Sequence, residues 1–133
     1  KEERVLVFQS DTIVLRNISD MEFPKLSMLG PVCVNLEDEN KFMINGGFSL
    51  RDKKLMSELC TNKVINSEVE DLFYTEQIRK HYPELMPSIN ECNDFAIESI
   101  GNKLIAKGIH GTDKYYRTFK GYKEIFEILE LSN

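Results

Sequence analysis

Short runs of apolar residues, each of strand length, dominate the first third of the chain. Val5 to Phe8 form one such run, which leads into the polar loop at residues 9–12. An uninterrupted apolar run is typical of a strand that is buried on both faces, as in an α/β sheet. Residues 17–29 contain Pro24 and mixed polarity, so we expect a loop or a broken helix there. A short apolar run covers residues 13–15, and further apolar runs predict strands over residues 31–36 and 42–44.

Helical patterns follow these strands. Ser49 has the features of an N-cap and predicts a helix that ends near Cys60. The sequence Ser67-Glu68-Val69-Glu70 is a capping-box pattern and predicts a second helix, which ends near Tyr82. The remaining patterns predict strands over 95–97 and 104–106, a turn over 108–111, and an amphipathic helix over 119–131. This mixture of strands and helices predicts an α/β fold in a single domain over residues 1–133.

The charge balance narrows the choice of partners. The chain has 133 residues and a formal net charge of −5, from 17 basic and 22 acidic side chains. An acidic chain is a poor general binder of nucleic acids or anionic membranes. No apolar stretch approaches the ~18 residues of a membrane span. We therefore expect neither a nucleic-acid partner nor a membrane span.

The three cysteines are widely spaced. Cys33, Cys60 and Cys92 are odd in number and form no CxxC pair, which argues against a zinc ribbon or a thioredoxin-like site. Thiols of this kind are typical of a reducing compartment. Since no signal peptide is visible, the sequence predicts a cytoplasmic location.

Two turns carry residues that could bind a ligand or a metal ion. Asp11 follows the first strand, and ligands of open α/β sheets collect at the carboxyl ends of strands, where a carboxylate can hold a divalent cation. Asn45-Gly46-Gly47 is a tight turn whose backbone N–H groups can bind an anion or a sugar hydroxyl, and Arg51 can stabilise negative charge beside it. In both cases the alternative is a turn without a functional role.

Two further candidates lie later in the chain. Glu70 and Asp71 begin a helix, where the helix dipole favours acids even without a function. Glu70 is accounted for by capping Ser67, which leaves Asp71 as a candidate general base. His110 is followed by Gly111 and can bind a metal or a phosphate, the alternative being an ordinary surface histidine.

In order and spacing, these pieces resemble a family of GT-A-fold glycosyltransferases. The matching segments are VLVFQSDT, NGGFSLR, VEDLFY, FAIES and GIHG, which together span residues 5–111. The NGGFSLR segment followed by Glu-Asp is the most specific part. The resemblance implies a GT-A-like mixed sheet flanked by helices, and transfer of a sugar from a nucleotide-sugar donor to an acceptor hydroxyl.

The resemblance also implies roles for individual residues. Asp11 matches the aspartate of a DxD-like motif that holds Mn²⁺ or Mg²⁺ on the donor diphosphate, and His110 matches a histidine that assists it. Glu70 and Asp71 match the catalytic acidic pair, in which the residue at the position of Asp71 is the base. Gly46 and Gly47 match a glycine loop near the donor sugar and the acceptor. From the residues themselves we expect Asn45 and Arg51 of the same segment to take part in this binding, and Lys114 near His110 can add positive charge.

Departures from the pattern keep other functions open. Gln9 stands where a full DxD motif has its first aspartate, and a GT-A domain begins with a βαβ half that would have to precede Lys1. We therefore expect the C-terminal portion of such a domain, completed by a preceding segment or by a second chain. One alternative is a non-catalytic module that binds a glycan or a protein. Another is a metal-dependent hydrolase or nuclease that uses Asp11, Glu70 and Asp71.

Overall fold

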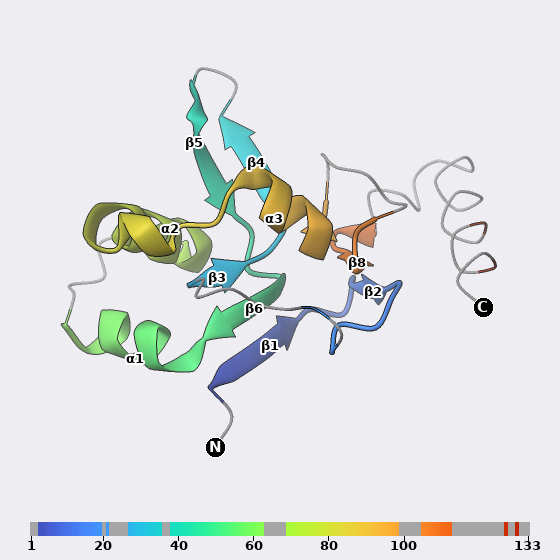
Figure 1. The fold of residues 1–133 in the computed structure, drawn as a ribbon, viewed down its shortest axis with the longest axis horizontal. Coiled ribbons are helices and arrows are strands. Elements are labelled where there is room, and N and C mark those ends of the chain that lie inside the picture. The colour runs from blue at the N-terminus through green and yellow to red at the C-terminus, as the bar shows by residue number, and fades with distance from the viewer. Residues whose placement is uncertain are drawn as a thin grey trace.

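A computed structural model describes residues 3–19, 21, 27–35, 38–62, 69–98, 105–112, 127 and 130. Over these residues the protein is a small mixed α/β domain (Figure 1). Lys114 and the helix expected over residues 119–131 lie outside the described residues, apart from Glu127 and Glu130. The elements in chain order are β1 (Arg4–Phe8), β2 (Ile13–Val14), β3 (Met28–Leu29), β4 (Val32–Asn35), β5 (Asp38–Ile44), β6 (Phe48–Asp52), α1 (Lys53–Asn62), α2 (Glu70–His81), the 3₁₀ turn η1 (Pro83–Leu85), α3 (Ile89–Phe95), β7 (Ala96–Ile97) and β8 (Gly108–Ile109).

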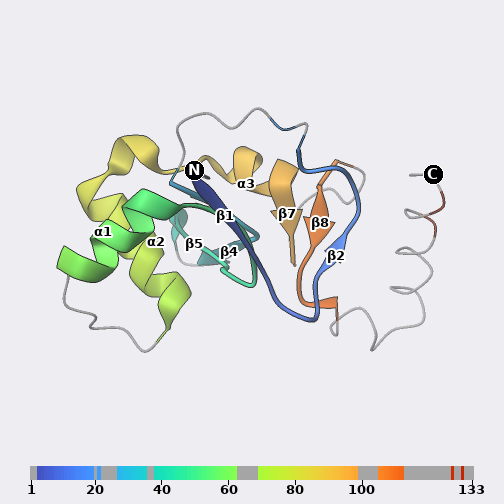
Figure 2. The ribbon, with the colours of Figure 1, turned by 90° about the horizontal axis from the view of Figure 1, so that it is seen from below.

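The described strands form three small sheets instead of the one mixed sheet that the sequence suggested. One sheet has the antiparallel order β1-β6-β3, and β4 pairs with β5 in a separate hairpin. The third has the order β2-β8-β7, in which β7 and β8 are parallel and β2 is antiparallel to β8. Figure 2 shows β2, β8 and β7 side by side at one end of the described fold, with α1 and α2 at the other. The parallel pair places the carboxyl ends of β7 and β8 at the same edge.

The first strand is present, but the expectation that both of its faces are buried was wrong. Within the described sheet β1 is an edge strand that pairs with β6, from Arg4 opposite Asp52 to Phe8 opposite Phe48. The Phe8 side chain is 69% exposed, and Val5 and Leu6 are also exposed. A continuous apolar run shows that a segment is apolar, but it does not show whether other elements cover one or both faces of the strand.

The main core lies where the sheet β1-β6-β3 meets the helices. Phe48 of β6 stacks on Phe95 of α3, with ring centroids 5.0 Å apart, and both side chains are fully buried. Burial of each ring contributes about 1.5–3 kcal/mol relative to exposure. The backbone N–H of Ile44 in β5 donates to Oγ1 of the buried Thr75, which ties α2 to the hairpin. These contacts fix α2 against the end of β5, where the glycine turn begins.

Two helices begin later than the sequence suggested. Ser49 is not an N-cap, because it lies inside β6; α1 begins at Lys53, and Oδ1 of Asp52 accepts from the Leu55 N–H at 2.8 Å. The second helix begins at Glu70, with Val69 at its N-cap, and Ser67 lies outside the described residues. Leu55, Met56 and Leu59 are buried as the helical pattern predicted.

The later strands also differ from the expected pattern. Gly108 and Ile109 form the central strand β8 where a turn was expected, and residues 105–106 are not in a strand. Gly108 suits this position because a Cβ there would overlap the buried Phe48 ring and lie 2.9 Å from the carbonyl oxygen of Ile13. The short helix α3 was missed, although Ser88 and Glu91 form a reciprocal capping box at its start.

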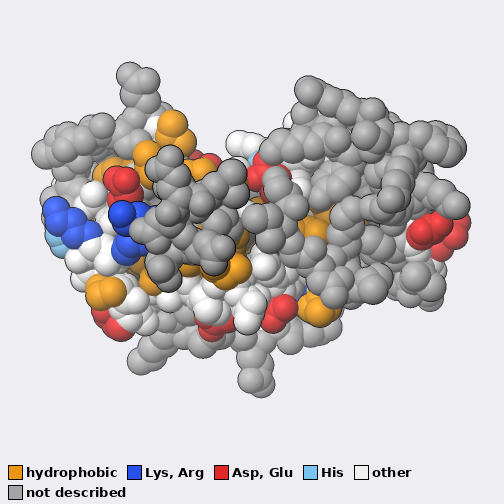
Figure 3. Space-filling view, turned by 90° about the horizontal axis from the view of Figure 1, so that it is seen from above, with side chains coloured by type: hydrophobic (Ala, Val, Ile, Leu, Met, Phe, Trp, Pro, Cys, Tyr) orange, Lys and Arg blue, Asp and Glu red, His pale blue; other side chains and the backbone are white. Residues whose placement is uncertain are grey.

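The described surface carries charges of both signs. On the face in Figure 3, basic side chains gather at the end formed by α1 and α2 with acidic groups beside them, and further acidic groups lie across the rest of this face. The last turn of α2 holds Arg79, Lys80 and His81, which the negative end of the helix dipole favours. In the described part of the chain, every helix falls short of the length and apolar character that crossing a bilayer requires.

The cysteines provide a simple test of the packing. Cys60 is exposed, whereas Cys92 is fully buried, and burial raises the pKa of the Cys92 thiol to about 12. Because the thiolate is the reactive form, a water-soluble disulfide reagent should modify Cys60 in the native protein and Cys92 only after unfolding in urea. Peptide mass spectrometry after timed labelling measures both. Modification of Cys92 at the rate of Cys60 in the native state would contradict this packing.

Candidate functional site

The turn Asn45-Gly46-Gly47 lies at the centre of the candidate site. It joins β5 to β6, and the Asn45 Oδ1 accepts from the Gly47 N–H at 2.7 Å, which closes a tight Asx turn. The Gly46 carbonyl accepts from Ser49 Oγ at 2.9 Å. Both glycines are buried. The predicted turn is confirmed, and its backbone is held from within the same segment.

The loop after β1 packs directly onto this turn. The carbonyl oxygen of Gly47 accepts from the Gln9 N–H at 2.7 Å and from Thr12 Oγ1 at 3.4 Å. The Asp11 carbonyl in turn accepts from the N–H and the Oγ1 of Thr112, at 3.0 and 2.8 Å. These bonds bring the residues that follow β1, β5 and β8 together, although up to 101 positions separate them in sequence.

His110 faces the same place and is not an exposed loop residue. It directly follows β8, its N–H donates to the Ile97 carbonyl, and the side chain is 6% exposed. Its Nε2 lies 3.1 Å from Gln9 Oε1 and 3.4 Å from Asp11 Oδ1. A Cβ on Gly47 would overlap this ring, so the glycine allows His110 to lie against the turn.

Glu98 is a site residue to which the sequence reasoning gave no role. It directly follows β7, is 6% exposed, and its Oε2 lies 3.8 Å from His110 Nδ1. The signal for Glu98 in the sequence is its position, because it is an acid that directly follows a short apolar strand. Asp11 lies in a similar position, shortly after the end of β1. Buried carboxylates are retained only when they are paired or hydrogen-bonded.

Arg51 contacts the turn at Gly46, whereas His110 contacts it at Gly47. Its Nε donates to Ser49 Oγ at 2.8 Å, its NH2 group donates to the Gly46 carbonyl at 3.1 Å, and it forms an ion pair with Glu70. The guanidinium lies 5.5 Å from the centre of the Tyr74 ring, a cation–π geometry. Burial, together with the hydrogen bond to Cys60, raises the pKa of Tyr74 to about 12, so that ring stays neutral.

These contacts define what Arg51 and Glu70 do in the folded protein. The Arg51 side chain is 9% exposed and joins the turn to the first turn of α2 through Glu70, which is 57% exposed. Glu70 therefore pairs with Arg51 in the described structure. The positive charge of Arg51 lies at the Gly46 carbonyl, next to the Asp71 carboxylate.

Asp71 lies in the first turn of α2 and points at the same glycine turn. The Gly46 backbone N–H donates to its carboxylate, and a Cβ on Gly46 would overlap that carboxylate and the Arg51 guanidinium. Burial raises the pKa of Asp71 above its ordinary value of 3.8, and Glu70 adds to the rise. The hydrogen bond from Gly46 and the charges of Arg51 and His110 act in the opposite direction. A carboxylate with a raised pKa that is reachable from solvent is suited to accept a proton.

Asp11 and His110 are spaced as two ligands of one divalent cation would be. Two oxygen or nitrogen ligands on adjacent positions of an octahedral ion are about 3 Å apart, because each lies about 2.1 Å from the metal. Asp11 Oδ1 and His110 Nε2, at 3.4 Å, are compatible with such a pair, and the side-chain amide oxygen Oε1 of Gln9 lies 3.1 Å from Nε2. Among the residues that the structure describes, no three His, Cys, Asp or Glu side chains form a metal-binding group. The pair therefore fits a cation that takes its other ligands from a bound molecule or water.

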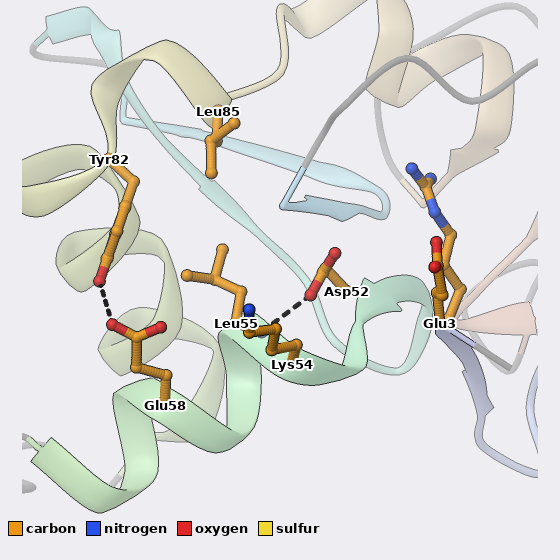
Figure 4. Close-up of a pocket in the computed structure, with 8 residues that line it drawn as sticks. Glu3, Asp52, Lys54, Leu55, Glu58, Tyr82 and Leu85 are labelled. Atoms are coloured by element: carbon orange, nitrogen blue, oxygen red, sulfur yellow. Dashed lines mark hydrogen bonds between the residues drawn. The ribbon is translucent and has the colours of Figure 1, made fainter. Parts of the chain in front are cut away.

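A hollow of about 420 Å³ lies away from this turn, between the start of β1, α1 and η1 (Figure 4). Tyr82 donates to Glu58 across it at 2.7 Å, and Asp52 is engaged in capping α1. The constellation around Gly46 and Gly47 does not contribute to its lining, which consists of Glu3, Arg4, Asp52, Lys54, Leu55, Glu58, Tyr82 and Leu85.

The fold and the site define a small α/β domain with a buried polar cluster around a double-glycine turn. Residues 1–110 match the model of a family described as "Protein of unknown function (DUF5672)". The chain belongs to this family. Neither a curated protein nor a solved structure matches the chain significantly.

Proposed function

We propose that this chain is a GT-A-like glycosyltransferase domain, in which Asp71 is the general base. The observation that carries the proposal is the position of Asp71. Its carboxylate accepts from the Gly46 N–H, has a raised pKa, and lies within the electric field of Arg51 and His110. An acceptor hydroxyl is a weak nucleophile and needs such a base in the transition state.

The other side of the turn supports a donor site. A nucleotide-sugar donor releases a diphosphate, whose charge a hard cation with oxygen ligands can stabilise. Asp11 and His110 would hold Mn²⁺ or Mg²⁺ through Oδ1 and Nε2, with the Gln9 amide beside them. Arg51 adds positive charge at the Gly46 carbonyl, and the backbone at Gly46 and Gly47 would orient the sugar.

Isothermal titration calorimetry with a panel of UDP- and GDP-sugars, with and without Mn²⁺, tests the proposal. We expect one donor to bind with a Kd of about 1 µM to 1 mM, the range in which enzymes commonly bind their substrates. Asp11→Asn should weaken the Mn²⁺-dependent binding at least about tenfold, as removal of a charged ligand predicts. Asp94→Asn, at an exposed position in α3, is the matched control and should bind as the wild type does.

Two other outcomes of the titration would change the proposal. Absence of heat for every nucleotide-sugar in the presence of Mn²⁺ would contradict the donor site. Binding of a free glycan in the same experiment, without any nucleotide, would favour the non-catalytic module on the same scaffold.

A further inference from the structure

We propose that Glu98 is a positioning residue that holds His110 with its Nδ1–H toward Glu98 and its Nε2 toward Asp11 and the glycine turn. The inference concerns the site of the proposed function. It relies on that function only for the role of Nε2, which would bind the cation. The pairing itself follows from the fold.

The parallel strands β7 and β8 bring the two side chains together. Ile97 of β7 is in register with Ile109 of β8, so Glu98 and His110 are the next residues on two paired strands. The His110 N–H donates to the Ile97 carbonyl at 2.9 Å, which continues the pairing by one step. The backbone therefore fixes both residues at one edge of the sheet before either side chain makes a contact.

The side chains then face each other in a buried place. Glu98 Oε2 lies 3.8 Å from His110 Nδ1, and both side chains are 6% exposed. This separation is within ion-pair range and is longer than a hydrogen bond. Gly111 has φ of +69°, and a Cβ there would lie 3.1 Å from Glu98 Cγ, so the glycine lets the chain turn tightly over the glutamate. Cys33 Sγ lies 3.7 Å from the same Oε2 and is a weak donor toward it.

The opposite edge of the imidazole ring faces the site. Nε2 lies 3.1 Å from Gln9 Oε1 and 3.4 Å from Asp11 Oδ1, and it abuts the Gly47 backbone. The Gln9 amide carries both a donor and an acceptor, so it can satisfy Nε2 in either protonation state. Ionised carboxylates face both ring nitrogens, Glu98 at Nδ1 and Asp11 at Nε2. Asp11 is 34% exposed and is screened by water, whereas Glu98 is 6% exposed and needs a partner, so we expect Glu98 to select the orientation. Histidines that bind metals are commonly held in this way, by a carboxylate on their other nitrogen.

Long-range ¹H–¹⁵N spectra of the histidine ring test the inference without any assay of transfer. The chain has two histidines, and His81→Gln assigns the signals of His110. At a pH of about 9, where free imidazole is neutral, we expect Nδ1 of His110 to carry the proton in the metal-free wild type. In Glu98→Gln, whose amide both donates and accepts, the signals should move toward the Nε2–H form.

Two outcomes would overturn the inference. One is a wild-type spectrum in which Nδ1 is bare, and this result stands even if Glu98→Gln fails to fold. The other is a folded Glu98→Gln protein with an unchanged His110 spectrum.

A second measurement separates this inference from the proposed function. If the wild type binds Mn²⁺, Glu98→Gln should weaken that binding about 10–100-fold, the usual effect of losing the carboxylate behind a ligating histidine. Unchanged Mn²⁺ affinity in the folded variant would count against the role of Glu98. If the wild type does not bind Mn²⁺ at all, the metal part of the proposed function fails, while the ring spectrum still decides whether Glu98 positions His110.

Discussion

Replacement of Asp71 by asparagine is expected to lower the rate of sugar transfer about 10²–10⁴-fold while the protein stays folded. Asparagine keeps an oxygen that can accept from the Gly46 N–H, so the contact with the glycine turn persists. It cannot take a proton from an acceptor hydroxyl. The measurement is the release of nucleoside diphosphate from the donor identified by calorimetry, with circular dichroism to verify the fold.

The pH dependence of stability separates the base from a structural carboxylate. Because burial raises the pKa of Asp71 in the folded state, the folded protein binds more protons than the unfolded chain just above pH 3.8. This group's contribution to the free energy of unfolding therefore falls as pH rises through that window. Asp71→Asn removes this cost, so at neutral pH the variant should be as stable as the wild type or more stable.

The neighbouring acids provide the comparison. Asp94→Asn changes an exposed carboxylate on α3 and should leave transfer unchanged. Glu70→Gln weakens the ion pair with Arg51 and should reduce transfer far less than Asp71→Asn. Turnover by Asp71→Asn equal to that of the wild type would remove Asp71 from the role of base.

Gly47→Ala should have the second large effect, through His110. The added Cβ would overlap the imidazole ring and lie 2.7 Å from Gln9 Oε1. Forcing a methyl group into such a packed place costs about 1–3 kcal/mol of stability. The displaced ring would also leave Asp11, so Mn²⁺-dependent donor binding should be lost. Urea unfolding and calorimetry measure the two effects.

A double-mutant cycle identifies the ring as the cause. In a His110→Ala background the space around Gly47 opens, and Gly47→Ala should then cost much less than it does in the wild type. Gly46→Ala serves as a comparison, because its Cβ would overlap Arg51 and Asp71 instead and should not be relieved by His110→Ala. Equal costs of Gly47→Ala in both backgrounds would show that His110 does not lie against the turn.

Local chemistry let the sequence predict several parts of this site. The turn at residues 45–47 follows from two adjacent glycines after an asparagine, whose side chain closes the turn through its own backbone. The start of the second helix near Glu70 and Asp71 follows from the preference of acids for the positive end of a helix. Such signals lie within a few residues of the feature that they predict.

The parts that the sequence did not predict depend on distant contacts. The exposure of Phe8 reflects the place of β1 at the edge of its sheet, which a run of apolar letters does not encode. The pairing of Glu98 with His110 depends on the register of β7 and β8, two strands of only two residues each. Arg51 looked like an anion ligand, and only the fold reveals that its guanidinium contacts the Gly46 carbonyl and pairs with Glu70.

The helix α3 is a different case, because its signal was local and was overlooked. Ser88 and Glu91 form the capping box, but the two prolines at 83 and 87 indicate an interruption of regular structure just before it. Proline before a cap is compatible with a helix that begins directly after it.

The central claim is that the residues after β1, β5 and β8, together with the first turn of α2, form one site for a nucleotide-sugar. An amide-resolved NMR titration with Mg²⁺ and the UDP- and GDP-sugar panel tests it most directly. We expect the largest shifts at Gly46, Gly47, Asp71 and His110, and no shift at Leu85 or Glu58 in the hollow of Figure 4. Shifts confined to the lining of that hollow, or none at saturating donor, would contradict the account.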